Sequence, residues 1–403
     1  MDISLEQLNL GEVPQSTEIL QQVTAGVRDL TDFLRKHYLQ EYIPQGGSKI
    51  KFLTGRAGSG KTHTARIIKA DAESEGYVTV YFSAKIVLLY DFREIYLEIL
   101  RQCDLEKILQ GCAEQIIREM NYDPSRIPEG KNFMDYLSDR HEADALTKNT
   151  IRVMLREKFT KNPLLDNGFA NCCSLLTGSF LGHPYLEQAN RDLLYAFLHG
   201  DRTIKISQIR ALGLSASKIS KYNARHLLRS LAEIVRMSGN KGLLVIIDDM
   251  ETLLNRGSVE MVKYTKLRRE DTYESIRQLI DDIDSMHNIM FVFGFDRTLI
   301  DDEKKGIKSY PALWMRVQNE IHSERFNRFA DIVDLDSLAL QEYTLDYILE
   351  MSLELAEKAE KASQKASILD EEKLQSLIEK AKYGAIGLPQ LVKEAILEGE
   401  TYE

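Results

Sequence analysis

The sequence predicts an α/β fold in which a parallel β-sheet is flanked by helices and interrupted by a large helical insertion. The stretch "KIKFLTGRAGSGKT" (49–62) runs an apolar strand into a glycine-rich turn and a helix, and "YVTVYFSA" follows as a second strand. Later runs, "LLVII" and "NIMFVFGF", are almost continuously apolar, as in a sheet covered on both faces. Between these strands, residues 92–238 show helical periodicity and no convincing strand.

The composition indicates an ordinary globular protein with two or three structural units. The chain has 403 residues, 43% of them hydrophobic, and a formal net charge of −10. This balance excludes a global positive field toward nucleic acid or anionic membranes, although local basic patches remain possible. Because no apolar run approaches a membrane span or a signal-peptide core, we expect a cytoplasmic protein. The four cysteines read as buried thiols of a reduced compartment, and the adjacent pair Cys172–Cys173 leaves a redox role open.

Residues 1–91 are predicted to form an N-terminal helix and the first part of the sheet core. Apolar positions at helical spacing fall between residues 17 and 43, and Gly46–Gly47 then turns the chain into the strand "KIKFLT". The helix "KTHTARIIKADAESEG" is expected to end at Gly76 as its C-cap. Strand, helix and strand in this order form a βαβ unit, which requires parallel strands.

The remaining boundaries follow from the change in pattern along the chain. We expect residues 92–238 to form the helical insertion, 239–335 the second part of the core and 336–403 a C-terminal helical lid. The stretch "ADIVDLDSL" contains a candidate last strand, and from Glu342 onward the pattern is helical to the end.

The glycine-rich turn fits the phosphate-binding pattern GxxxxGK[ST] at every fixed position, between a strand and a helix. Glycines let successive backbone N–H groups point at a phosphate, and the helix N-terminus adds partial positive charge. Lys61 is expected to bridge the β- and γ-phosphates of ATP, and Thr62 to ligate Mg²⁺. This predicts a P-loop NTPase; the alternative is an ordinary glycine-rich turn. The predicted nucleotide-binding residues of the turn are Gly55, Gly58, Ser59, Gly60, Lys61, Thr62 and His63.

Two aspartates at the end of "LLVII" supply the second half of such a site. Asp248 is expected at the carboxyl edge of the sheet, beside the glycine-rich turn, where it would hold Mg²⁺ together with Thr62. Asp249 is the candidate for polarising the attacking water, and Glu251 is the fallback for that role. The alternative is that the aspartates only cap a following helix, a position where Asp is common.

Further charged residues are candidates for sensing the nucleotide. Asp296 and Arg297 follow the strand "NIMFVFGF", whose carboxyl end should open on the same crevice, and a salt-bridged turn is an equally good interpretation of this pair. Arg325 and Arg328 precede the candidate last strand. Either could stabilise the charge of the transferred phosphoryl group, in cis or from a neighbouring subunit, and Arg316 ranks below them.

The order of these motifs resembles the AAA+ superfamily and its relatives among origin-recognition-like and signal-transduction ATPases. Residues 193–254, from "LLYAFLHG" through "NARHLLRSLAEIVRMSGNKGLLVIIDDMETLL", are more specific and resemble the ATP-binding proteins of bacterial BREX-type phage-exclusion systems. The resemblance implies ATP with Mg²⁺ and a helicase-like or DNA-modifying partner in defence against phage, with any DNA contact mainly through that partner. An arginine acting in trans would require an oligomer.

Two positions carry the family pattern in altered form. Relatives often have a Gly-Arg pair that contacts adenine near the amino terminus, where this sequence has Gly26, Val27 and Arg28. A second-sensor arginine often follows the Gly-x-Pro turn of the lid, and here Gln390 stands in its place. The uncharged Gln390 predicts hydrolysis that is slow or depends on a partner.

Two functions compete at this nucleotide site. The primary prediction is ATP hydrolysis that remodels or loads a DNA-processing partner, and it rests on Lys61, Thr62 and Asp248 with an adjacent carboxylate. The second is a nucleotide-dependent switch and scaffold that binds ATP and scarcely hydrolyses it. Asp249, where many P-loop ATPases carry Glu, and Gln390 favour the switch.

A third possibility is direct DNA binding through residues 205–229. Gly213 and Ile219 have spacings similar to those of a helix-turn-helix. The preferred interpretation of this stretch is instead a helical hairpin that only packs before the acidic strand. The basic residues near this turn are Lys205, Arg210, Lys218 and Lys221.

Overall fold

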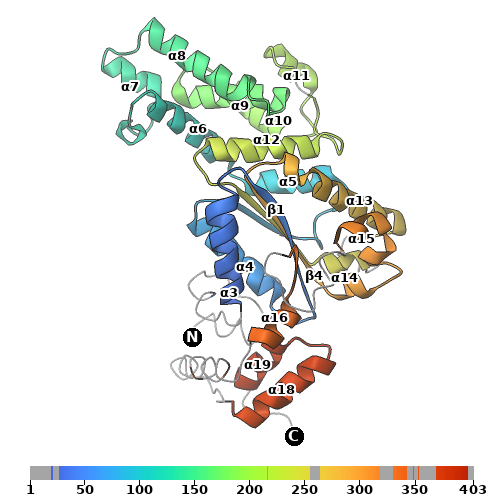
Figure 1. Ribbon diagram of the computed structural model, residues 1–403. Coiled ribbons are helices and arrows are strands. Elements are labelled where there is room, and N and C mark those ends of the chain that lie inside the picture. Colours follow the sequence, from blue (N-terminus) through green and yellow to red (C-terminus); the bar gives the residue numbers. More distant parts are fainter. Residues whose placement is uncertain are drawn as a thin grey trace.

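The computed structural model describes residues 20, 27–215, 217–254, 264–317, 330–342, 348, 353 and 369–397. Five parallel strands form one sheet in the order β2-β3-β4-β1-β5, with helices on both faces (Figure 1). The α/β class with a parallel, helix-flanked sheet is therefore confirmed. The strands are β1 (Ser48–Gly55), β2 (Val78–Ser83), β3 (Leu243–Asp248), β4 (Ile289–Asp296) and β5 (Ile332–Asp334).

The strand order decides which residues meet at the carboxyl edge of the sheet. β4 lies between β1 and β3, so the acidic strand is not the direct neighbour of the strand that enters the glycine-rich turn. All five strands still end at the same edge because they are parallel. Residues 55, 83, 248, 296 and 334 end these strands.

One face of the sheet is covered by the amino-terminal helices. α3 (Arg28–Leu34) continues directly into the π-helix η1 (Arg35–Tyr42), and α4 (Lys61–Ser74) follows the glycine-rich turn. They pack on Leu53, Ile246 and Val292 of the sheet. The helix predicted for residues 17–43 is present in its described part, but its second half widens into a π-helix, which apolar spacing does not reveal.

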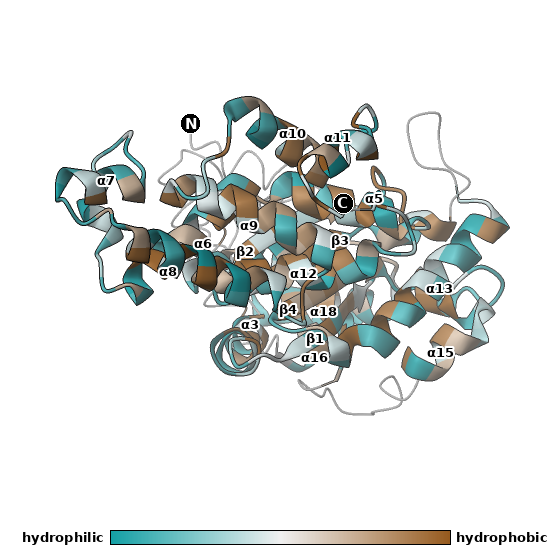
Figure 2. Cartoon of the chain, turned by 90° about the horizontal axis from the view of Figure 1, so that it is seen from above, coloured by the Kyte–Doolittle hydropathy of each residue, from teal (hydrophilic) through white to brown (hydrophobic). Residues whose placement is uncertain are grey.

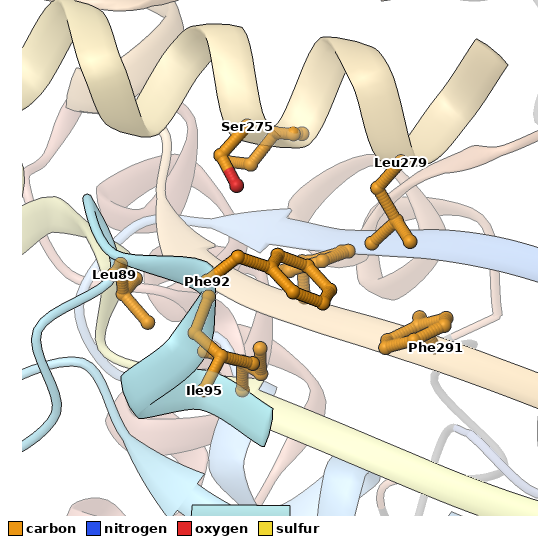
Figure 3. Close-up of a pocket in the computed structure, with 9 residues that line it drawn as sticks. Leu89, Phe92, Ile95, Ser275, Leu279 and Phe291 are labelled. Atoms are coloured by element: carbon orange, nitrogen blue, oxygen red, sulfur yellow. The ribbon is translucent and has the colours of Figure 1, made fainter. Parts of the chain in front are cut away.

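The other face packs against α5 (Phe92–Gln102) and α13 (Lys266–Asp282). Figure 3 shows a small apolar pocket at this seam, where Phe92 and Leu279 approach Phe291 of β4. No charged side chain and no residue of the glycine-rich turn lines it. We therefore describe this pocket as a packing seam of the core.

The described residues between β2 and β3 form helices, and most of these helices stand above the sheet in Figure 1. The Gln102 side chain of α5 binds both the backbone N–H and C=O of Tyr81, which closes the free edge of β2. After α5 come α6 (Leu105–Glu119), η2 (Pro124–Arg126), α7 (Phe133–Asp139), α8 (Ala145–Leu155), η3 (Arg156–Thr160), α9 (Asn167–Leu181), α10 (Gln188–Leu198), α11 (Ile206–Ala211) and α12 (Ala224–Met237).

Two expectations for this block have clear outcomes. All four cysteines are buried free thiols, and burial raises the pKa of Cys103 and Cys112 to about 12, which keeps them protonated.

The helix-turn-helix and hairpin interpretations of residues 205–229 are both wrong. α11 ends at residue 211 and the next helix, α12, begins only at residue 224, whereas a helix-turn-helix turn has about three or four residues.

The chain after β3 completes the core and ends in helices at the bottom of Figure 1. Among the described residues from 369 onward there are two separate helices with a break at 384–387. The "ELAEKAEKASQKAS" stretch, which the sequence predicted to be helical, lies outside the described residues. No helix among the described residues is both long and apolar enough to span a bilayer. These elements are η4 (Met250–Leu254), η5 (Ile283–Ser285), α14 (Thr298–Asp301), η6 (Ile307–Ser309), α15 (Pro311–Val317), α16 (Leu335–Glu342), α18 (Glu371–Tyr383) and α19 (Leu388–Leu397).

Candidate functional site

The phosphate loop, residues 55–62, joins β1 to α4 with three glycines in positive-φ conformations. The φ angles are +157° at Gly55, +75° at Gly58 and +88° at Gly60. Residues other than glycine rarely adopt such backbone angles. The backbone N–H groups of Gly58, Gly60, Lys61 and Thr62 donate to no acceptor within the described ranges. A cluster of free amides at a helix N-terminus is a cradle for an anion, so this loop fits a phosphate group.

Lys61, the first residue of α4, holds its ammonium group over the same loop. Its Nζ donates to the carbonyl oxygens of Gly55 and Arg56 at 2.9 and 2.8 Å, and it lies 3.8 Å from Oδ2 of Asp296. The side chain is only 13% exposed. The structure thus brings Lys61 and Asp296, which are 235 positions apart, to the mouth of the phosphate loop.

Asp248 joins the acidic strand to the phosphate loop. Its Oδ2 accepts from Thr62 Oγ1 and from Tyr81 Oη, each at 2.8 Å, and its Oδ1 accepts from the Asp249 N–H at 2.9 Å. The residue is 2% exposed. A methyl group at Gly294 of β4 would lie 2.3 Å from Asp248 Oδ1, so this glycine provides the room for the carboxylate.

Tyr81 of β2, whose hydroxyl donates to Asp248, was not anticipated from the sequence. Burial and the nearby Asp248 raise its pKa, which keeps the phenol protonated and able to donate. Within the described residues no three His, Cys, Asp or Glu side chains form a metal cluster. The pair Thr62 and Asp248 nevertheless fits Mg²⁺, because this ion takes one or two protein ligands and completes its shell with water and phosphate.

Asp249, the candidate for polarising water, contacts two side chains, one at the end of β2 and one just after it. Ser83 Oγ donates to Oδ2 at 2.6 Å, and Lys85 Nζ lies 2.7 Å from Oδ1. Asp249 has φ +60°, an uncommon value for a residue other than glycine. Both carboxylate oxygens are therefore satisfied within the protein, and the backbone is held in a strained conformation that aims the side chain toward β2.

Glu251, the fallback candidate, lies on the other side of the site. Its Oε2 accepts from the backbone N–H of Asp296 at 3.1 Å, and burial raises its pKa. Arg297 pairs with Asp334 at 3.1 Å and with Asp301 at 3.5 Å, whereas Asp296 lies 3.8 Å from Lys61. The two residues of the predicted turn pair therefore contact different partners, Asp296 at the phosphate loop and Arg297 at β5 and α14.

His63 stands one residue beyond the Mg²⁺ candidate on α4. Burial and the neighbouring Arg66 lower its pKa to about 4, so the imidazole is neutral at pH 7. A neutral ring contributes no charge to a phosphate. Arg316 donates to both carboxylate oxygens of Asp281 through Nε and Nη2. It also lines a cavity with Ser48, at the amino end of β1 and therefore opposite to the phosphate loop.

The carboxyl-terminal helices contact the phosphate loop directly. The N–H groups of Gly387 and Gln390 donate to the carbonyls of Ala57 and Gly58 at 2.8 and 3.2 Å. A Cβ at Gly58 would lie 2.2 Å from Gln390 Oε1. The start of α19 is thus part of the wall of the loop, and Gln390 occupies the position at which the sequence comparison expected a charged sensor.

Arg56, at a variable position of the motif, contacts the carboxyl-terminal helices from the phosphate loop. Its N–H and Nε both donate to Asp336 Oδ2, at 2.8 and 3.1 Å. Its Nη1 donates to the carbonyls of Ala381 and Gly384 at 2.5 and 2.7 Å. One side chain therefore connects the phosphate loop, α16 and the end of α18.

Several candidates are not placed by the structure, and several contributors were missed. Gly26, Arg325 and Arg328 lie outside the described residues, while Val27 is the N-cap of α3 and Arg28 is its first residue. The missed contributors are polar residues at the ends of the neighbouring strands and one glycine inside a strand, a position that signals close approach by another group. They are Arg56, Tyr81, Ser83, Lys85, Gly294 and Asp336.

Comparison with known proteins identifies the family. A model of the BREX system ATP-binding proteins BrxC/D matches residues 2–392. Comparisons with curated proteins and with solved structures gave no match. The matched region includes the phosphate loop, the acidic strand and the first half of α19. Because the match spans nearly the whole chain, this protein belongs to the family of BREX system ATP-binding proteins, as the resemblance of residues 193–254 predicted.

Proposed function

We propose that this chain binds ATP with Mg²⁺ at the phosphate loop and hydrolyses it. The observation that carries the proposal is the contact between Thr62 and Asp248 at 2.8 Å, next to the unpaired amides of the loop. Two segments that are 186 positions apart meet there to form a hydroxyl–carboxylate pair. This pair suits Mg²⁺, and the amides suit the phosphates that the ion accompanies.

The roles of the individual residues follow from their positions. Bound Mg²⁺ would neutralise phosphate charge and polarise the group that is transferred. Lys61 would exchange its bonds to the loop carbonyls for bonds to phosphate oxygens. Asp296, close to the Lys61 ammonium, orients that side chain. Asp249 would orient and deprotonate the attacking water, with Glu251 as the second candidate for that role.

Hydrolysis on this scheme requires Asp249 to leave Lys85. An ion pair with Lys85 and a hydrogen bond from Ser83 hold this carboxylate toward β2, so the side chain must leave these contacts before it can reach an attacking water. This arrangement favours slow basal turnover that a partner or a neighbouring subunit accelerates. It is also the specific observation that favours the second candidate function, a nucleotide-dependent switch with little hydrolysis.

The fold details that complete this proposal are AAA+-like. Residues 1–91 and 239–335 would form the ATPase core, 92–238 the insertion and 336–403 a lid. The contacts of Gly387 and Gln390 with the phosphate loop support a lid that responds to the nucleotide. Arg325 or Arg328 would act on the phosphate of a neighbouring subunit in an oligomer, as arginines do in many P-loop enzymes.

The family supplies the setting for this activity. We propose that the chain is the ATP-binding component of a BREX-type system that defends bacteria against phage, and that it works with a helicase-like or DNA-modifying protein of the same system. Family membership supports this role. Nucleotide binding would control the contact with that partner through the carboxyl-terminal helices.

Calorimetry with MgATP, together with an assay of phosphate release, tests the proposal. Lys61→Ala and Asp248→Asn should each weaken MgATP binding by at least about tenfold, since each removes a charged contact worth about 1.5–3 kcal/mol. Lys69→Ala is the matched control, because Lys69 lies on the same helix and pairs with Glu73 on its exposed side. Equal binding by wild type, Lys61→Ala and Lys69→Ala would refute the site.

A further inference from the structure

The insertion carries a basic stretch that the nucleotide site does not use. Residues 202–232 contain no Asp or Glu in a chain whose net charge is −10. Blocks of one charge sign without compensation mark interaction surfaces rather than cores. The Lys and Arg residues of this stretch are Arg202, Lys205, Arg210, Lys218, Lys221, Arg225 and Arg229.

Four of these side chains face solvent without a carboxylate partner. Lys205, Arg210, Lys218 and Lys221 are exposed, and none of them pairs with an acidic residue of the described chain. By contrast, Arg202 lies 3.9 Å from Glu94 and Arg225 lies 3.4 Å from Asp282. We call the four unpaired residues together with Tyr222 the basic patch.

Tyr222 adds an aromatic face to this patch. It is 84% exposed, and the Lys221 ammonium lies 5.2 Å from its ring centroid. An exposed aromatic ring beside lysines suits a base that stacks on the ring while the cations hold the phosphates.

The backbone around the patch is fixed in position. The guanidinium of Arg93 on α5 donates to the carbonyls of Gly200 and Ile219, so it holds these two points, one before and one after α11, next to each other. Asn223 accepts from the N–H of Ser220 at 2.7 Å and donates to the carbonyl of Lys218 at 3.1 Å. The described backbone at Lys218, Ile219 and Ser220 is therefore held by the side chains of Arg93 and Asn223.

The patch lies far from the nucleotide site. α11, which carries Arg210, stands at the top of Figure 1, and the helices that contact the phosphate loop lie at the bottom. Figure 2, which looks down on that top surface, shows α11 beside α10 on the near side of the molecule. A ligand of the patch would not compete with ATP.

From the charge, the exposed ring and the fixed loop, we infer that the basic patch binds single-stranded DNA, with cations on the phosphates and Tyr222 stacked on a base. This goes beyond the proposed ATPase activity and does not depend on it. Four phosphate contacts to a single strand predict a slope of about −3 for the logarithm of the binding constant against the logarithm of salt concentration.

Fluorescence anisotropy with a labelled oligothymidylate tests the inference on the full chain. We compare Arg210→Gln/Lys218→Gln/Lys221→Gln with Lys148→Gln/Arg152→Gln/Arg156→Gln, which removes the same charge from exposed positions at α8 and the start of η3. The patch variant should bind about a hundredfold more weakly at about 0.1 M salt, because three phosphate contacts are lost. The α8–η3 variant should bind like wild type.

Further arms separate the competing explanations. Tyr222→Ala should weaken binding of the single strand at least about fivefold and leave duplex binding unchanged. The inference is overturned if wild type does not bind the oligonucleotide at about 50 mM salt, or if both charge variants lose the same affinity for it. It is also overturned if polyglutamate displaces the labelled oligonucleotide as well as unlabelled oligothymidylate does. Retained MgATP binding in the patch variant shows that the nucleotide site is intact, so the two proposals can fail separately.

Discussion

Replacing Gly294 by alanine tests whether the tight packing around Asp248 organises the site. The backbone of β4 at this position is an ordinary strand, so alanine in open space would be stabilising by about 0.5–1 kcal/mol. In this structure the new methyl group would lie 2.3 Å from Asp248 Oδ1, against an ordinary contact of 3.4 Å or more. The carboxylate must therefore move by on the order of 1 Å.

Such a movement breaks at least one bond from Thr62, Tyr81 or the Asp249 N–H. Each hydrogen bond to a charged group contributes about 1.5–3 kcal/mol, so we expect the unfolding free energy to fall by about 2–4 kcal/mol. MgATP affinity should fall at least about tenfold, since the Mg²⁺ ligand is displaced. Urea unfolding and calorimetry measure the two effects.

A double-mutant cycle decides whether the clash is the cause. In the Asp248→Ala background the obstructing oxygen is absent, so Gly294→Ala should cost less than about 0.5 kcal/mol or become stabilising. If Gly294→Ala destabilises both backgrounds equally, the contact with Asp248 does not explain its effect and the reasoning is wrong.

Three further perturbations probe other parts of the site and core. Lys85→Ala frees Asp249 and should raise basal phosphate release about two- to fivefold, the worth of a half-exposed ion pair; an unchanged or lower rate would contradict a restraining role. Arg56→Ala should speed hydrogen exchange in α18 and α19 by at least about tenfold, because the clamp to the phosphate loop is lost, and protection equal to wild type would argue against it. Hydrogen bonds from Lys241, Gln40 and Arg35 lower the pKa of Glu75 to about 2 from 4.5, so its contribution is present above pH 4.5 and is lost as the pH falls toward 2. Wild type should therefore exceed Glu75→Gln by up to about 3 kcal/mol in unfolding free energy at pH 7, and the difference should shrink by pH 3.

The sequence predicted the sheet strands because their residues form local patterns. Apolar runs bounded by turns placed β1 to β4 within one or two residues of their observed ends, and β5 lies inside the stretch 330–338 that was expected to contain it. The GxxxxGK[ST] pattern placed the phosphate loop, because its function is carried by consecutive backbone amides. The π-helix η1 and the open connection after α11 escaped prediction, since apolar spacing does not report which hydrogen bonds the backbone makes.

Contacts between residues that are far apart in the sequence could not be predicted in the same way. The restraint of Asp249 by Lys85 depends on β2 being the neighbour of β3, which the order β2-β3-β4-β1-β5 decides. For Arg297 the sequence left open a nucleotide sensor or a salt bridge within the turn, and neither interpretation named Asp334 on β5, the carboxylate with which it pairs in the structure.

The sequence alone therefore determined that a glycine-rich loop with the phosphate-binding pattern and an acidic strand exist in a helix-flanked parallel sheet. Those features depend on residues close together in the chain. Only the tertiary structure decided that Thr62, Tyr81 and Gly294 surround one carboxylate and that α19 closes on the loop. Such contacts join segments far apart in sequence, and their geometry is set by how the strands order and how the helices pack between them.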